Sequence, residues 1–276
     1  MTQTDTASRA RAHPPRGENF PLVGLFAPSE KARAIKAFYA FARTADDVAD
    51  RADLSPQAKL DRLADMEWGL EGGPDRTGRT LRNAVGEGPG LQAARDLLGA
   101  FRQDAKGKVY ADLDDLRAYC RMSADPVGRF LLSLYEEAQT THDPSDALCT
   151  ALQILNHLQD IREDAATLDR VYLPADWMAE AGVARADLTA AGSTPALRRV
   201  IDRALDECDG LLRRAAPLPG LIRARSLRGQ ATATLHLAGT LARRLRRGDP
   251  LARRIAPTRF DFARAALRGA GAAARP

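Results

Sequence analysis

The sequence of 276 residues has little of what would place it among secreted or membrane-spanning proteins. Its three cysteines, Cys120, Cys149 and Cys208, form neither a CxxC pair nor an even set for disulfides, which indicates a reducing environment. No apolar run reaches the roughly 18 residues of a membrane span, and the N-terminus has no apolar stretch of the signal-peptide type. We therefore expect a cytoplasmic protein, soluble or peripheral to the inner face of the membrane.

Alternating β-branched runs are also nearly absent, and helical periodicity dominates, so an all-α fold is expected. With 45% hydrophobic residues the chain can bury a large core, and no linker interrupts its middle. We expect one domain at 18–268, with disordered segments at 1–17 and 269–276, which lack an apolar period. The expected helices are 28–51, 56–70, 91–105, 113–137, 144–164, 194–215 and 221–246, with a short helical piece at Leu81.

The net charge of +5 comes mostly from arginines scattered through an Ala-rich chain, which favours solvated helix faces over a nucleic-acid surface. The densest basic run, 243–254, contains no aromatic residue that could stack on bases. No nucleic-acid partner is expected. The basic run better suits anionic lipid head groups or a diphosphate.

An acidic stripe lies on the first expected helix. Spacings of 4, 3 and 4 residues place four side chains on one helix face: Tyr39, Arg43, Asp46 and Asp50. Asp46 and Asp50 stand one turn apart, with Cβ atoms roughly 5–6 Å from each other, and could serve one cluster of hard cations. Because two such carboxylates repel, a positive group is expected between them.

A second polar stripe lies on another expected helix, whose remaining faces are apolar. Spacings of 3, 4 and 4 put four side chains in line: Gln153, Asn156, Asp160 and Asp164. One such stripe alone would most simply be a solvated, salt-bridged face. Two stripes, each with an Asp pair at i, i+4 and apolar flanks, indicate a Mg²⁺-diphosphate site, since Mg²⁺ is commonly held by carboxylates together with phosphate oxygens.

Other metals fit the stripes less well. A di-iron bundle needs a Glu three residues before a His, and none of His13, His142, His157 and His236 has one. Zinc is not expected, because the stripes offer no thiolate and His157 should point off its stripe.

These motifs resemble those of the squalene/phytoene synthase family, which joins two prenyl diphosphates head to head or processes the cyclopropyl intermediate. The likeness covers about 18–254 and includes the segment Arg170-Val-Tyr172-Leu-Pro174 after the second stripe. It implies an isoprenoid synthase helical bundle around a central cavity. The residues it implies are metal ligands Asp46, Asp50, Asn156, Asp160 and Asp164, supported by Asp47 and Glu163; catalytic Tyr39, Arg43 and Tyr119; and substrate-binding Phe20, Arg43, Gln153, Arg170 and Tyr172.

Within the family, four stretches look more like the bacterial hydroxysqualene synthases of hopanoid biosynthesis: 18–21, 101–104, 119–129 and 145–153. Gln159 replaces a usual Arg and Asp125 a usual Gly, which favours an enzyme that takes presqualene diphosphate rather than building it. The resemblance then implies Mg²⁺-dependent release of diphosphate and capture of the carbocation by water, giving hydroxysqualene without NADPH.

Alternatives stay open at this point. A presqualene diphosphate, squalene or phytoene synthase would share the metal site and differ in substrate and product. A catalytically inactive helical scaffold in isoprenoid assembly is the non-enzyme alternative, against which the intact ligand positions argue. Peripheral contact with a membrane or with other squalene-pathway enzymes also stays open.

Overall fold

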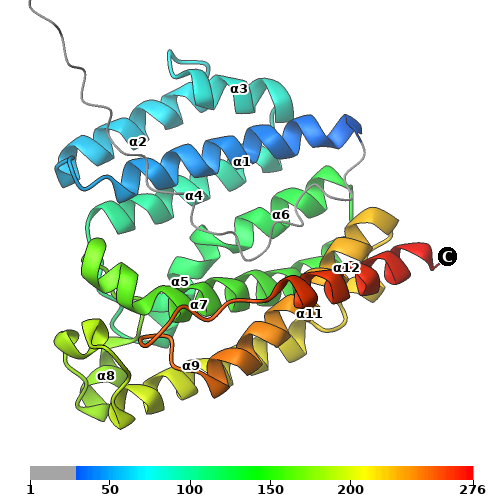
Figure 1. Ribbon diagram of the computed structural model, residues 1–276. Helices are drawn as coiled ribbons and strands as arrows, with labels where there is room; N and C mark the ends of the chain where they lie inside the picture. The colour runs from blue at the N-terminus through cyan, green and yellow to red at the C-terminus, as the bar shows by residue number, and fades with distance from the viewer. Residues whose placement is uncertain (1–28, 276) are drawn as a thin grey trace, which may run out of the picture.

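A computed structural model describes residues 29–275, and the regular elements in this range are all helices, as predicted (Figure 1). The α-helices are α1 Ser29–Asp50, α2 Pro56–Leu70, α3 Arg76–Val85, α4 Pro89–Ala105, α5 Leu113–Ser123, α6 Asp125–Leu134, α7 His142–Thr167, α8 Ala175–Ala181, α9 Pro195–Ala215, α10 Leu218–Leu221, α11 Arg225–Arg247 and α12 Arg259–Ala274. Two short 3₁₀ helices are η1 Gln139–Thr141 and η2 Arg185–Thr189. Within 29–275, no helix is long and apolar enough to cross a membrane.

Several helices begin where a capping residue precedes a proline. Ser55 caps α2 by accepting a hydrogen bond from the backbone N–H of Ala58 at 3.2 Å, and Pro56 follows it. Thr194 caps α9 in the same way, with Pro195 next. A proline at this place loses no helical hydrogen bond, because the first helical N–H groups have no intrahelical acceptor.

The helices form two groups, drawn from blue to cyan and from green to red in Figure 1. Helices α1 to α4 surround one core, which contains Phe41, Leu63 and Leu98. Helices α5 to α11 contribute to a second core, centred on α7, which contains Leu155 and Ile201. The two acidic stripes therefore lie on helices of different groups, α1 and α7.

The expected helix at 113–137 is two helices, α5 and α6, that meet at Ala124. Ala124 leaves the helical conformation, with φ −128° and ψ −50°. Pro126 explains the break, since it has no N–H for the carbonyl of Met122 and its ring would clash with that carbonyl. A single stretch of chain thus changes direction between Tyr119 and Val127, two residues of the site described below.

The expectation of a disordered tail from Gly269 is wrong as far as Ala274, because α12 continues to that residue. Its start carries a capping box in which Thr258 and Asp261 exchange side-chain and backbone hydrogen bonds. Gly269 lies against Gly229 of α11 so closely that a Cβ on Gly269 would stand 2.6 Å from the Gly229 carbonyl oxygen. The small residues that suggest disorder by composition therefore allow two helices to pack closely. The expected segment 1–17 lies outside the described residues.

Candidate active site

The two acidic stripes face one cavity of about 330 Å³. Tyr39, Arg43 and Asp46 line it from α1. Its lining residues from the second stripe are Gln153, Asn156, Asp160 and Asp164. Asp50, one turn beyond Asp46, is outside the lining. The structure therefore brings together both stripes, which are more than a hundred residues apart in sequence.

Two arginines form ion pairs with the acidic residues of α1. Arg43 reaches Asp46 at 3.4 Å and Asp47 at 3.0 Å, so the positive group expected near the carboxylates comes from the same helix. Arg170, from the segment after α7, donates to Asp50 at 2.6 Å. Asp47 is mostly exposed and takes part through Arg43 alone among the contacts described. The α1 stripe is thus a set of paired charges rather than bare carboxylates.

The acids of α7 have partners from the same helix and from the C-terminal segment. Arg254, between α11 and α12, contacts Asp160 with a distance of 3.1 Å from Nε to Oδ1. His157 Nδ1 lies 3.9 Å from Asp164 Oδ2, and both side chains are nearly buried. Gln159 is buried, and its amide donates to the carbonyl of Ile255, next to Arg254. Gln159 therefore fixes the segment that delivers Arg254 to the cavity.

His157 corrects a prediction from the sequence, because it lines the cavity instead of pointing off the stripe. Its ring stacks on Tyr172 with centroids 3.6 Å apart and 12° between the planes. Its Nε2 lies 3.2 Å from the amide nitrogen of Gln153. The reason is that 153, 157, 160 and 164 also follow helical spacing, so the polar face is wider than a single line.

A buried carboxylate, Asp104 of α4, holds two tyrosines at the cavity wall. It accepts hydrogen bonds from the hydroxyls of Tyr119 at 2.9 Å and Tyr172 at 2.7 Å. Burial raises the pKa of Asp104, against the opposing effects of Arg170 and the two phenols. Burial also raises the pKa of both tyrosines well above the usual value, so their hydroxyls stay protonated and donate. The positions of Tyr119 and Tyr172 are thus fixed by one acid.

Arg170 joins three parts of the wall and is itself only 7% exposed. Besides Asp50, it donates to the backbone carbonyls of Ala49 at 2.8 Å and Asp104 at 3.2 Å. Burial alone would lower the pKa of Arg170, but the negative charges of Asp104 and Asp50 offset this, and the pKa is raised. The guanidinium therefore stays charged and links α1 to α4.

Sequence reasoning found the stripe residues and missed Asp104, His157 and Arg254 as members of the cavity. The stretch 101–104 was singled out for its resemblance, yet no spacing rule pointed to Asp104 as the acceptor for Tyr119 and Tyr172. The remaining predicted residues lie elsewhere. Glu163 is exposed on α7 and does not line the cavity, and Phe20 lies outside the described residues.

A second, apolar hollow of about 240 Å³ adjoins the first. The two share four lining residues: Ser123, Val127, Gln153 and Asn156. Beyond them the wall is largely aliphatic, with Leu131 of α6, Leu152 of α7 and Leu227 of α11 among its residues. The site therefore joins a charged cavity to an apolar hollow, with the amide groups of Gln153 and Asn156 where the two meet.

The donor atoms of the two stripes fit a hard cation. Among residues 29–275, no three His, Cys, Asp or Glu side chains converge closely enough to hold a metal by themselves. Instead, carboxylates and the amide of Asn156 stand on two sides of one cavity, and such oxygen donors are what Mg²⁺ prefers. The arrangement suits a cation that is held partly by protein and partly by the phosphate oxygens of a ligand.

The thiols have no part in this chemistry. Cys120 and Cys208 are fully buried, and burial raises the pKa of each thiol well above its usual value. Burial likewise raises the pKa of Cys149 to about 12. Such thiols are poor nucleophiles at neutral pH, because the thiolate is the reactive form.

Comparison of the sequence with known families gives one extensive match. The squalene/phytoene synthase family matches residues 14–261. The hydroxysqualene synthase of Rhodopseudomonas palustris is 38% identical over 265 residues, covering 95% of this chain and 90% of the relative. That of Zymomonas mobilis is 37% identical over 243 residues, covering 86% and 82%.

Solved structures agree with the sequence matches. The squalene synthase HpnC from Alicyclobacillus acidocaldarius superposes with a TM-score of 0.71 at 30% identity, covering 83% of this chain and 88% of that one. A dehydrosqualene synthase solved with a ligand gives a TM-score of 0.75 at 24% identity, covering 93% and 92%, a likeness in fold.

Proposed function

The chain belongs to the squalene/phytoene synthase family, enzymes that act on prenyl diphosphates, and from this premise we propose that it converts presqualene diphosphate into hydroxysqualene. The carbon–oxygen bond to the diphosphate breaks with its electron pair, which leaves a cyclopropylcarbinyl cation. This cation rearranges with opening of the three-membered ring to an allylic cation, and a water oxygen attacks the allylic cation and loses its proton to the diphosphate. The support is the extensive identity with relatives named hydroxysqualene synthase, together with the stretches that already resemble that group.

The observation that carries the proposal is the junction between the charged cavity and the apolar hollow. A substrate with a diphosphate head and long hydrocarbon chains needs both environments next to each other. The shared residues Ser123, Gln153 and Asn156 are polar, so water can be held at the boundary where the reacting carbon would lie. An entirely apolar boundary would exclude the water that the reaction consumes.

We further propose that Mg²⁺ is the metal. The residues that would hold it are Asp46, Asp50, Asn156, Asp160 and Asp164. When bound, it would neutralise charge on the departing diphosphate. Arg43 and Arg254 line the same cavity and can donate charge-assisted hydrogen bonds to phosphate oxygens.

Tyr119, Tyr172 and His157 line the same cavity. Tyr119 and Tyr172 each donate their single hydroxyl proton to Asp104, which leaves oxygen lone pairs that can accept a hydrogen bond from a water. Their ring faces, and that of Tyr39 at the cavity edge, can stabilise a nearby cation by about 0.5–2 kcal/mol each. Asp104 is then a positioning residue, which keeps both phenols in place.

The test is a product analysis with the purified chain. Given presqualene diphosphate and Mg²⁺ without a nicotinamide, the chain should release diphosphate and form hydroxysqualene, and ¹⁸O from labelled water should appear in the alcohol. EDTA should stop the reaction and Mg²⁺ should restore it. Farnesyl diphosphate alone should react much more slowly. Squalene formed only with NADPH, or rapid conversion of farnesyl diphosphate into presqualene diphosphate or phytoene, would instead assign one of the other family activities.

We also propose that the enzyme is cytoplasmic and in peripheral contact with the membrane, into which its long, largely apolar alcohol product partitions. An inactive scaffold is set aside, because the chain belongs to a family of enzymes. In hopanoid biosynthesis the expected gene neighbours are a second synthase of this family and a flavin amine-oxidase-like desaturase.

A further inference from the structure

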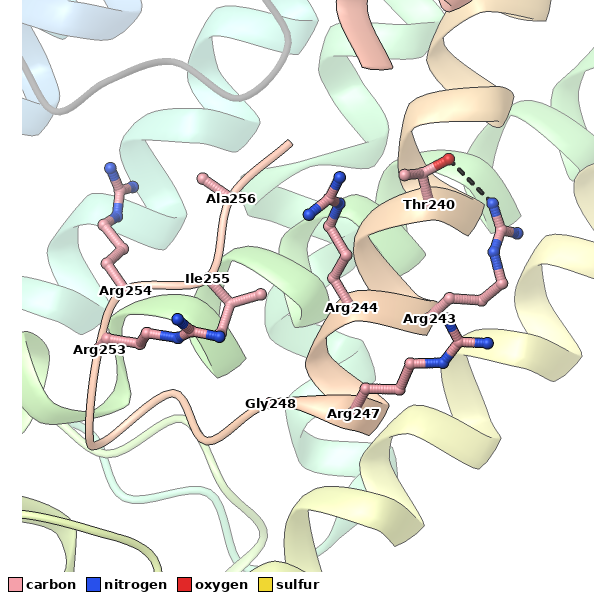
Figure 2. Close-up of a pocket in the computed structure, with 9 residues that line it drawn as sticks. All are labelled: Thr240, Arg243, Arg244, Arg247, Gly248, Arg253, Arg254, Ile255 and Ala256. Carbon is pink, nitrogen blue, oxygen red and sulfur yellow. Dashed lines mark hydrogen bonds between the residues drawn. The ribbon is translucent and has the colours of Figure 1, made fainter. Parts of the chain in front are cut away.

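A third hollow, of about 540 Å³, lies between the C-terminal half of α11 and the segment 248–256 that leads to α12 (Figure 2). We call it the arginine pocket, because five of its nine lining residues are Arg243, Arg244, Arg247, Arg253 and Arg254. None of those nine residues is acidic. It is formed by the basic run that the sequence already marked out, and the proposed catalysis uses only Arg254 from it.

The charges in the arginine pocket are mostly uncompensated. Among residues 29–275, Arg243, Arg247 and Arg253 form no ion pair with a carboxylate, and Arg243 donates only to the hydroxyl of Thr240 at 2.9 Å. Arg244 pairs with Asp261 at 2.6 Å, yet its Nε is buried with no hydrogen-bond partner in this range. A buried donor without a partner costs free energy, which an anion in the pocket would recover.

A simpler explanation covers only part of this cluster. Arginines in the last turn of a helix interact favourably with its dipole, and this accounts for Arg244 and Arg247. It does not account for Arg253, which belongs to the segment after the helix and extends back toward α11 (Figure 2). Two separate stretches of chain thus direct guanidinium groups at one hollow, where like charges would repel without an anion.

We propose that the arginine pocket binds a phosphate-bearing anion without a metal, and that its ligand is the diphosphate released by the reaction. Planar guanidinium groups match phosphate oxygens in pairs, which favours this class of anion. Arg254 lines both the pocket and the charged cavity, so the two sites adjoin at one residue. The identity of the ligand as diphosphate rests on the proposed function, whereas the preference for phosphate groups rests on the pocket itself.

The direct test is titration calorimetry of the full chain with inorganic diphosphate in EDTA, which removes the metal-dependent contribution of the catalytic cavity. The wild-type chain should bind diphosphate, and the variant Arg243→Gln/Arg247→Gln should bind at least tenfold more weakly. The matched control is Arg213→Gln/Arg214→Gln, which removes the same charge from exposed positions at the end of α9. This control should stay within twofold of wild type.

Equal binding by the pocket variant and wild type would overturn the proposal, as would an equal loss in the control, since binding would then follow net charge alone. A second arm separates free diphosphate from a lipid head group. If only phosphatidylglycerol vesicles, and not diphosphate in solution, bind in an Arg243- and Arg247-dependent way, the pocket is a lipid contact and the proposal fails. These measurements involve no turnover, so their outcome is independent of whether hydroxysqualene is formed.

Discussion

The charged cavity and the arginine pocket adjoin at Arg254, but their charges are arranged in opposite ways. In the cavity the acids are paired with basic residues, such as Asp46 with Arg43 and Asp160 with Arg254. In the pocket three arginines lack an acidic partner within 29–275. A cavity of paired charges has little net attraction for a diphosphate until a cation is added, whereas a pocket of one sign attracts it directly. We therefore expect diphosphate binding to require a metal ion in the charged cavity but not in the arginine pocket.

The largest expected effect tests the cavity. Asp46→Asn or Asp160→Asn should lower the rate of diphosphate release at least about 1000-fold, equivalent to roughly 4 kcal/mol in the barrier, because each removes a carboxylate proposed to hold Mg²⁺. Helical circular dichroism should be unchanged, since neither side chain belongs to the apolar core. Asp47→Asn is the matched control, being off the stripe and exposed, and should lose only several-fold. Wild-type turnover by either stripe variant at saturating Mg²⁺ would contradict the assignment.

The second-largest effect comes from replacing an arginine by glutamine in the charged cavity, compared with the same replacement in the arginine pocket. Arg170→Gln should lower the free energy of unfolding by about 3 kcal/mol, because it removes a buried guanidinium that donates to the partly buried Asp50 carboxylate and to two backbone carbonyls. Arg247→Gln, on the exposed rim of the arginine pocket, should change it by less than about 0.5 kcal/mol. Urea denaturation measures both. Similar losses of unfolding free energy in the two variants would mean that the arginines of the pocket stabilise the fold instead of serving an anion.

An acid without an arginine partner gives an intermediate effect that depends on pH. Burial raises the pKa of Asp125 to about 7, and the hydroxyl of Thr150, 2.8 Å away, only partly opposes this. Between the unfolded value of 3.8 and about 7 the folded state holds more protons, so stability falls as pH rises through this window. Asp125→Asn cannot ionise and should be more stable than wild type by about 1–3 kcal/mol at pH 8, with little difference at pH 4.

Urea titrations at the two pH values measure this, and Asp114→Asn, an exposed acid of α5, is the control that should show no such trend. The lower end of the range is favoured because Asp125 opens α6, where the helix N-terminus stabilises a negative charge. A gain from Asp125→Asn that is the same at pH 4 and pH 8 would show that ionisation is not its cause.

The smallest effect concerns the neutral partners of Asp104. Tyr119→Phe and Tyr172→Phe should each cost about 1 kcal/mol of stability, the usual value of one hydrogen bond, because Asp104 keeps the other phenol as a donor. The double variant should cost more than the sum, since the buried carboxylate then loses both donors. Denaturation of the three variants gives the coupling energy, and strict additivity would show that the two phenols act independently.

Local patterns in the sequence were enough to predict most helices and both stripes. Apolar periodicity identified α2, α4, α7 and α9 closely, because this pattern is set by residues within a few positions of one another. The i, i+4 acids were likewise visible, since helix geometry alone puts Asp46 beside Asp50 and Asp160 beside Asp164.

The sequence did not reveal which residues far apart along the chain contact each other. Arg254 meets Asp160 across 94 residues, and Tyr172 meets Asp104 across 68. No spacing rule connects such positions. Helix α12 was missed for a different reason, because its Ala and Gly content has no strong apolar period, while its stability comes from close contact with α11.

Two contacts with α11 fix the position of α12. At one end Gly269 and Gly229 touch without room for a methyl group on either, so their spacing has no slack. At the other end Asp261 holds Arg244 at the edge of the arginine pocket. Because one helix carries both contacts, a bulkier residue at position 269 would tilt α12 and move Asp261. The shape of the arginine pocket therefore depends partly on Gly229 and Gly269, which do not line it.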